Sequence, residues 1–312
     1  MQPHISIIVP VFKAENCLIE LYSRLVHSLS QIVDSFEIIF IEDCGEDKSW
    51  SLIIDLAERD HRVKGFKFSR NFGQHYGITA GLDICEGDWV VVMDCDLQDR
   101  PEDIHLLYSK AQEGFDVVLA RRGIRKDKWI NLVTSWLFYK TFNYLADLNY
   151  DGNVGNFRII SKKVAKNYVC MREQMRFFGG LISWMGFNTA DIVIQQDERY
   201  AGGSSYTFKK RMKLAIEIII AYSDKPLRMA VKFGFLISLF SFLYGGYIIY
   251  KGFTNNLPIM GWSSIMASIY FIGGIIIMNV GVLGIYLGKA YDEVKRRPLY
   301  IISESTQSGH IK

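Results

Sequence analysis

The chain of 312 residues carries a formal net charge of only +3, with 36 Lys and Arg residues against 33 Asp and Glu residues. This near-balance excludes a protein that binds nucleic acid through bulk positive charge. Hydrophobic residues make up 49% of the chain and aromatic residues 14%, which is high for a soluble enzyme. The five cysteines are scattered without a CxxC pair, so we expect reduced thiols rather than a disulfide framework or a zinc site.

The first half of the sequence alternates short apolar runs with helical patterns. The runs are continuously hydrophobic, so we expect strands that are covered on both faces. The expected strands are 5–12, 36–43, 63–69, 89–94 and 116–120, and the expected helices are 15–32, 47–59, 74–85 and 101–113. This alternation predicts an α/β fold with a mostly parallel, Rossmann-like sheet.

Charged residues follow several predicted strands. The second strand ends in "IEDCGED", the fourth in "MDCDLQD", and the fifth in Arg121 and Arg122. Ligands of doubly wound sheets bind beyond the carboxyl ends of the strands, so we expect these side chains on one edge. No GxGxxG motif follows the first strand and no P-loop motif occurs, which disfavours a dinucleotide-binding or P-loop domain. For Asp43 alone, a solvated turn residue stays an open alternative.

Asp94 and Asp96 lie two residues apart, directly after a very apolar run. Two carboxylates in this spacing, with the amide oxygen of Gln98, suit a hard divalent cation such as Mg²⁺ or Mn²⁺. A cation that bridges a diphosphate neutralises its charge as it leaves, and the arginines of the same edge can bind a second phosphate. The pattern predicts a metal and diphosphate site.

After residue 228 the composition changes. The stretches 233–250 and 252–288 contain no charged residue. Because a bilayer span needs about 20 apolar residues, we expect two transmembrane helices near 230–251 and 263–287. Gly284 and Gly288 allow close approach of helices, so a homo-oligomer through these helices stays open.

Basic residues flank this hydrophobic hairpin, whereas its connection carries only Lys251. The positive-inside rule therefore places both ends of the hairpin in the cytoplasm. Two further segments, 129–148 and 206–223, combine basic and aromatic residues with an apolar body and predict helices at the membrane surface; core helices are the alternative. We expect a cytoplasmic catalytic domain over 1–228, a hairpin over 229–290 in the inner membrane, and a cytoplasmic tail over 291–312.

These features resemble the inverting GT-A glycosyltransferases of family two, and within them the polyprenyl-phosphate group that includes dolichyl-phosphate mannose synthases and bactoprenol glucosyltransferases. The matching stretches cover nearly the whole chain in family order. They are "SIIVPVFKAEN", "IEDCGEDKS", "SRNFGQHYGITAGLDICEGDWVVVMDCDLQDRPE", "DVVLARR", "GNFRIISKKV", "ERYAGGSSY" and "YLGKAYDEVKRRPLY". The ordered set is specific, whereas a DxD motif alone is weak evidence.

The resemblance implies roles for residues at matching positions. Those implied to bind the nucleotide-sugar are Pro10, Phe12, Glu15, Asp43, Asp94 and Arg199. Those implied to hold the metal are Asp94, Asp96 and Gln98, and those implied to act in catalysis are Asp94, Asp96 and Arg122. Those implied to meet the acceptor phosphate are Arg122, Ser135, Arg199 and Lys209.

The sequence departs from the family pattern at three positions. Lys13 replaces an asparagine, Asn156 stands where many relatives have aspartate, and Ser205 replaces a lysine whose charge Lys209 or Lys210 can supply. These changes bear on the identity of the sugar and on the geometry of the acceptor more than on the class of reaction.

The resemblance implies inverting transfer of a sugar from a nucleotide-sugar, UDP-glucose or another UDP-hexose, to undecaprenyl phosphate at the cytoplasmic membrane face. The product would be a lipid-linked sugar donor for modification of cell-envelope glycans. The acceptor phosphate is already anionic near neutral pH, so a strong general base is not required.

Two alternatives remain at this point. A processive polysaccharide synthase would need a QxxRW motif and more spans, but "QMRFFGG" lacks the tryptophan. A non-catalytic relative that scaffolds a partner would not need Asp94, Asp96 and Gln98, and a test of metal dependence separates it from an enzyme.

Overall fold

The computed structural model of the chain describes residues 4–123, 138, 140–146, 154–194, 208–254 and 261–307. The chain divides into two compact units. Unit 1 comprises residues 1–141, 148–211 and 297–312, and unit 2 comprises residues 142–147 and 212–296. The end of the chain therefore belongs to the same unit as its beginning.

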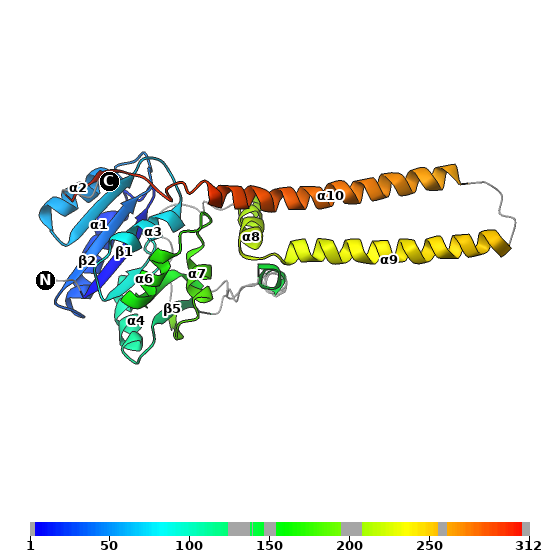
Figure 1. Cartoon of the computed structure of the whole chain (residues 1–312). Helices are drawn as coiled ribbons and strands as arrows, with labels where there is room; N and C mark the ends of the chain where they lie inside the picture. Colours follow the sequence, from blue (N-terminus) through cyan, green and yellow to red (C-terminus); the bar gives the residue numbers. More distant parts are fainter. Residues whose placement is uncertain are drawn as a thin grey trace. The chain divides into compact units, whose positions relative to one another are not determined.

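Unit 1 is an α/β unit, and Figure 1 shows its strands and helices. Its elements in chain order are β1 (Ile5–Val11), α1 (Leu18–Ser30), β2 (Phe36–Glu42), α2 (Ser49–Arg59), β3 (Val63–Phe68), α3 (Gln74–Ile84), β4 (Trp89–Val92), the 3-10 helix η1 (Pro101–Asp103), α4 (Ile104–Ala111), β5 (Val117–Arg122), β6 (Val154–Ser161), α6 (Lys162–Cys170), α7 (Phe178–Trp184), β7 (Thr189–Ile194) and β8 (Ile302–Ser305). The strands and helices predicted for the first 120 residues are confirmed to within about three residues at each end.

The strands form one mixed, eight-stranded sheet in the order β7-β5-β6-β4-β1-β2-β3-β8. The pairs β1–β2, β1–β4, β2–β3 and β5–β7 are parallel, whereas β6 runs antiparallel to both β4 and β5, and β8 runs antiparallel to β3. The predicted α/β fold is confirmed. The sequence did not predict β6, β7 and β8, of which β6 and β8 run antiparallel to their neighbours.

Apolar side chains alternate between the two faces of the central strands, so both faces are covered. Ile7 and Val9 of β1 belong to a core that also contains buried residues of α1, α2 and α4. Ile8 points to the other face, where a Cβ at Gly81 of α3 would lie 2.3 Å from its side chain. The absence of a side chain at Gly81 thus lets α3 pack closely on β1.

The strand directions bring the predicted site segments to one edge, which we call the carboxyl edge. In register, Val11 of β1 lies beside Glu42 of β2, and Ile8 lies beside Val92 of β4. β5 runs parallel to β4 because both are antiparallel to β6, so the Arg122 end of β5 lies on this edge too. The same geometry puts the first residues of β6 here.

Unit 2 contains most of α8 (Phe208–Tyr222) and the two long helices α9 (Lys225–Thr254) and α10 (Trp262–Val294). Stretches Lys225–Gly245 and Ser268–Val294 are long and apolar enough to cross a membrane, and neither is buried within the protein. The two predicted apolar helices are thereby confirmed. Within α10, Asn279 Nδ2 donates a hydrogen bond to Ile275 O at 2.9 Å.

The expected interfacial segments are only partly described. α8 covers most of 206–223, whereas only residue 138 and residues 140–146 of the segment 129–148 lie within the described residues. Within unit 2, Tyr286 of α10 donates a hydrogen bond to Ser223 O at 2.8 Å, and Lys225 lies over the ring of Tyr144. These contacts join α10 to the residue after α8, and α9 to the described part of the segment 129–148.

Candidate active site at the carboxyl edge of the sheet

Asp43 follows β2 and is held by the loop between β3 and α3. Its side chain is buried, and Oδ1 accepts a hydrogen bond from the backbone N of Phe72 at 2.6 Å while Oδ2 accepts one from the N of Gly73 at 2.8 Å. Burial raises the pKa of Asp43 to about 6, although these two amides oppose the shift. Each carboxylate oxygen keeps a second lone pair for a ligand N–H or O–H.

The turns of the carboxyl edge contain strained backbone. Lys13, Cys44, Glu46 and Leu97 all have φ between 53° and 59°, and they follow β1, β2 and β4. Left-handed backbone at residues other than glycine costs about 1–3 kcal/mol and concentrates at functional sites. Between two of them, Gly45 comes so close that a Cβ would lie 2.8 Å from the N of Lys13. The strained residues therefore lie where the loop after β1 meets the loop after β2.

The residues after β1 line the same edge. Pro10 is buried and contacts Gly77 of α3, whereas Phe12 exposes 46% of its surface. Glu15 accepts a hydrogen bond from the backbone N of Lys48, and its own N donates to Asp47. An exposed ring beside buried Asp43 can stack on a nucleobase, which is the part implied for Phe12.

Asp94 is fixed by two side-chain amides from distant parts of the chain. Its Oδ1 accepts hydrogen bonds from Gln74 Nε2 at 2.6 Å and from Asn156 Nδ2 at 3.3 Å. Both partners are neutral donors, whereas an aspartate at position 156 would bring a second negative charge toward Asp94. The departure from the family pattern at Asn156 therefore places a hydrogen-bond donor, and no further negative charge, next to Asp94.

Arg158 supports this arrangement and was not singled out from the sequence. It is 3% exposed, and its Nη2 and Nε donate to the carbonyl oxygens of Gly155 and Asn156 at 2.6 and 3.3 Å. The bent side chain thus fixes the backbone that carries the Asn156 amide. Gln74 was also missed, because no motif in the sequence predicts its hydrogen bond to Asp94, 20 residues later.

Asp96 and Gln98 lie in the turn after β4, where the N of Gln98 donates to Asp96 Oδ1 at 3.2 Å. Among the described residues no group of three or more His, Cys, Asp and Glu side chains is arranged to hold a metal. A pair of carboxylates is nevertheless sufficient for Mg²⁺ or Mn²⁺ when substrate phosphates complete the shell. Asp94 and Asp96, separated by one residue and kept as hydrogen-bond acceptors, fit that requirement.

The residues implied for the acceptor phosphate are less completely described. Arg122 ends β5 on the carboxyl edge, and Lys209 lies in the first turn of α8, but the side chains of both lie outside the described part. Ser135 and Arg199 lie outside the described residues altogether, as does Ser205. β7 is parallel to β5, so the chain leaves Ile194 toward Arg199 from this same edge.

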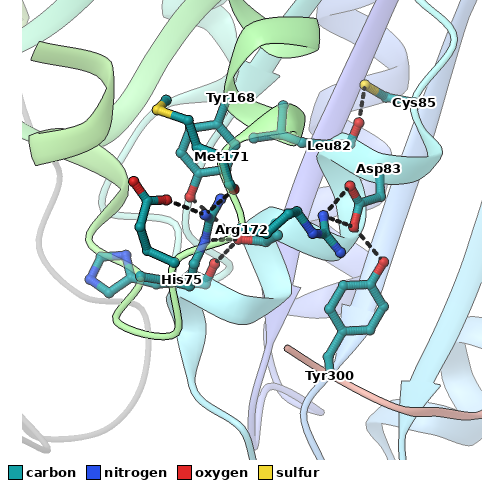
Figure 2. A network of polar contacts seen from close by, with 11 residues as sticks. His75, Leu82, Asp83, Cys85, Tyr168, Met171, Arg172 and Tyr300 are labelled. Atoms are coloured by element: carbon teal, nitrogen blue, oxygen red, sulfur yellow. Dashed lines mark hydrogen bonds and ion pairs between the residues drawn. The ribbon is translucent and has the colours of Figure 1, made fainter. Parts of the chain in front are cut away.

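A buried polar cluster fixes the segment after α6 onto α3, and Figure 2 shows it. The fully buried Arg176 donates to Thr79 Oγ1 at 3.1 Å and to Met171 O at 2.5 Å, and it lies over the ring of Tyr168. Burial, together with the charges of Arg158 and Arg176, lowers the pKa of His75 to about 4, which keeps this imidazole neutral.

An α/β sheet with paired aspartates at its carboxyl edge, followed by two long apolar helices, defines the class as a GT-A type glycosyltransferase. The chain belongs to glycosyl transferase family 2, whose family model matches residues 6–169. It is 38% identical over 303 residues to the SfII prophage-derived bactoprenol glucosyl transferase of Shigella flexneri, covering 96% of this chain and 98% of the relative.

Two further similarities were found, one to a curated relative and one to a solved structure. The chain is 37% identical over 300 residues to the prophage bactoprenol glucosyl transferase homolog of Escherichia coli K12, covering 96% of this chain and 98% of that protein. Glucosyl-3-phosphoglycerate synthase from Mycobacterium tuberculosis, crystallised with Mn²⁺, UDP and phosphoglyceric acid, matches 70% of this chain and 77% of its own, with a TM-score of 0.49 and 14% identity.

Proposed function

We propose that this enzyme transfers a hexose, with UDP-glucose as the leading candidate donor, to a polyprenyl phosphate such as undecaprenyl phosphate, with inversion at the anomeric carbon. The observation that carries the proposal is Asp94, pinned by two amides beside Asp96 at the edge where Asp43 lies. Relatives named bactoprenol glucosyl transferases match over nearly the whole chain, which supports a polyprenyl acceptor and glucose as the sugar.

In this proposal Asp43 accepts a hydrogen bond from the nucleoside and Phe12 stacks on the base. Asp94 and Asp96 would hold Mg²⁺ or Mn²⁺, with Gln98 as a further oxygen donor, and the cation would neutralise charge on the departing diphosphate. Glu15 closes the nucleoside end by its bond to the loop after β2. These residues orient the donor and leave its anomeric carbon open to attack.

In this proposal, positively charged side chains bind the acceptor phosphate, and no general base is needed to activate it. Arg122 leads this set because its strand delivers it to the carboxyl edge, and Arg199, Ser135 and Lys209 complete it. A phosphate oxygen attacks the anomeric carbon, the bond to the nucleoside diphosphate breaks, and the diphosphate leaves with the electron pair. No proton has to be removed, because the phosphate monoester is ionised near neutral pH.

The proposed membrane topology follows from the sheet. β1 and β8 belong to one sheet, and the two candidate spans lie between them in the chain. If α9 crosses the bilayer, α10 must cross back, because residues of one sheet share one side of the membrane. Together with the flanking lysines and arginines, this places unit 1 in the cytoplasm at the inner membrane.

The reaction is tested by incubating membranes that contain the enzyme with labelled nucleotide-sugars, one at a time, and undecaprenyl phosphate. We expect transfer of a hexose to lipid from one UDP-sugar, its loss with EDTA, and its return with Mn²⁺ or Mg²⁺. Asp96→Ala should lower transfer at least about a thousandfold. Asp88→Ala is the matched control, since this exposed aspartate lies at the opposite end of β4. Full activity of Asp96→Ala would contradict the metal site.

The topology is tested with reporter fusions. A reporter after Asn255, between the spans, should report the far side of the membrane, and one after residue 307 should report the cytoplasm. Two reporters on the same side would contradict the hairpin.

A further inference from the structure

The segment Arg297–Thr306, which we call the C-terminal strap, lies along β3 in unit 1. Its strand β8 pairs antiparallel with β3, and the pairing continues beyond β8 on both sides. The N of Ser69 donates to Ile301 O at 3.0 Å, and the N of Thr306 donates to Gly65 O at 3.0 Å. The strap therefore follows β3 up to the residues that lead into the loop at Asp43.

Tyr300 anchors the strap to α3. Its hydroxyl donates to Asp83 Oδ2 at 2.7 Å, and Arg172 Nη1 lies 2.8 and 2.9 Å from the two oxygens of the same carboxylate, as Figure 2 shows. A second hydrogen bond holds the strap, in which Gln174 Nε2 donates to Arg297 O at 2.8 Å. Tyr300 is thus fixed at its hydroxyl, which leaves its ring in a defined place.

Two aromatic contacts connect the ring of Tyr300 with the loop that binds Asp43. It stacks on Phe68, with centroids 5.4 Å apart, and Phe68 meets Phe72 edge to face, also at 5.4 Å. The N of Phe72 donates to Asp43 at 2.6 Å. Phe68 is fully buried, so its ring has no free space into which to turn if Tyr300 keeps its position.

We propose that Tyr300 is a positioning residue for donor binding. Its ring holds Phe68 and Phe72 so that the amides of residues 72 and 73 meet the Asp43 carboxylate in the geometry that the nucleoside requires. This inference rests on the proposed function, in which Asp43 binds the donor. It means that a segment following the membrane helices, outside the 6–169 match, sets the affinity for a soluble substrate.

The test measures UDP-glucose binding by calorimetry on the full-length enzyme in detergent. Tyr300→Ala should raise the Kd about two- to tenfold, the value of one aromatic contact, while kcat stays within about twofold of wild type. Tyr300→Phe keeps the stacked ring but loses the hydrogen bond to Asp83, so its Kd should lie closer to wild type than that of Tyr300→Ala. Hydrogen–deuterium exchange of residues 69–73 should be faster in Tyr300→Ala than in wild type and in Tyr300→Phe.

The chain offers a matched control in Tyr22. Its hydroxyl donates to Asp60, whose carboxylate also binds an arginine, Arg62, so the chemistry around Tyr22 repeats that around Tyr300 on the α1 and α2 side of the sheet. Tyr22→Ala should lower the melting temperature about as much as Tyr300→Ala. It should leave the Kd for UDP-glucose and the exchange at residues 69–73 unchanged.

Each result decides one question. An unchanged Kd and unchanged exchange at residues 69–73 in Tyr300→Ala, with a lowered melting temperature, would overturn the positioning role and leave Tyr300 as a fold contact. Failure of the wild-type enzyme to bind UDP-glucose or UDP would contradict the proposed donor instead, and the exchange data would still decide whether Tyr300 orders the loop. If Tyr300→Ala does not fold, the comparison of Tyr300→Leu with Tyr22→Leu replaces it.

Discussion

The sheet of unit 1 and the long helices of unit 2 use the same apolar residue types in opposite ways. Ile7 and Val9 of β1 are fully buried, whereas Phe242 of α9 and Ile277 of α10 expose 79% and 74% of their surface. In unit 1 the apolar side chains find their partners within the protein. In unit 2 they can be covered only from outside, and an acyl-chain environment does this without a protein partner.

Two amide side chains, one in each region, differ in how far along the chain their hydrogen-bond partners lie. At the carboxyl edge, Gln74 donates over a long sequence separation to Asp94, whereas Asn279 of α10 satisfies itself on its own helix four residues earlier. Of these two amide side chains, Gln74 contacts a candidate site residue, whereas Asn279 contacts the backbone of a candidate span, so we expect the first and not the second to affect catalysis. The predictions below test this division, from the largest expected effect to the smallest.

The largest effect is expected from a matched pair of isoleucine substitutions, one at a buried position and one at an exposed position. Ile7→Ala should lower the free energy of unfolding by about 2–5 kcal/mol, because it leaves a cavity in the sheet core. Ile277→Ala should cost less than about 1 kcal/mol, because lipid replaces the lost contacts. Urea unfolding in detergent, followed by tryptophan fluorescence, measures both. Equal losses would mean that Ile277 is packed within protein.

Arg122 tests the acceptor side of the edge. Arg122→Lys should raise the KM for polyprenyl phosphate or lower kcat by about ten- to hundredfold, because a lysine cannot make two parallel hydrogen bonds to one phosphate. Donor binding, measured by calorimetry on the same variant, should hardly change. If donor affinity collapses while acceptor kinetics stay intact, Arg122 belongs to the nucleotide end.

Substitutions of the two amide side chains, Gln74 and Asn279, test whether only the contact at the candidate site matters for catalysis. Gln74→Leu should lower kcat/KM about tenfold, because Asp94 loses the amide donor that lies 2.6 Å from its Oδ1. Asn279→Leu in α10 should leave kcat/KM unchanged, and steady-state kinetics in the same lipid mixture compare the two. A fully active Gln74→Leu enzyme would show that this hydrogen bond is not needed to orient Asp94.

The smallest effect concerns pH. With a pKa of about 6, Asp43 is ionised at pH 7 and mostly protonated at pH 5.5, so the affinity for UDP-glucose should fall about fourfold between them. Calorimetry measures it apart from the titration of the acceptor phosphate. Asp43→Asn should bind more weakly at pH 7 and lose this dependence. A wild-type Kd that is independent of pH in this range would contradict the prediction.

The same pKa has the opposite sign for folding. Because the folded state holds the proton more tightly than the unfolded chain, the stability that Asp43 contributes is fully present below its ordinary pKa of 3.8 and is lost as the pH rises through 6. Weaker donor binding at pH 5.5 therefore cannot be ascribed to unfolding caused by this group.

Sequence patterns predicted the parts whose structure is decided locally. β1, β2 and β4 are continuous apolar runs in a sheet covered on both faces, and α9 and α10 are long enough to be assigned by composition. β8 has the sequence "ISES", which is short and polar and has no intrinsic preference for a strand. Only its pairing with β3, over 200 residues earlier in the chain, makes it one.

In the candidate site, too, some residues could be predicted from the sequence and others could not. Asp94, Asp96 and Asp43 could be singled out because a carboxylate after an apolar run is unusual. Their partners could not, since the bonds to Gln74, Asn156 and Phe72 depend on which strands become neighbours in the folded sheet. The strained backbone at Lys13 and Leu97 was equally hidden, because neither residue favours a left-handed conformation.

The position of β8 in the chain has a consequence for biosynthesis. The ribosome releases β1 to β7 first, but β3 stays an open strand edge until α9, α10 and then β8 have been made. An unpaired edge strand can pair with another chain and cause aggregation. Charged side chains on such a strand, here Lys64 and Lys67 of β3, oppose this pairing. In the proposed topology, a chain in which α10 fails to insert would hold β8 on the far side of the membrane and leave the edge of β3 unpaired. The sheet would then be completed only in correctly inserted chains, and an unpaired β3 would expose the other chains to proteolysis.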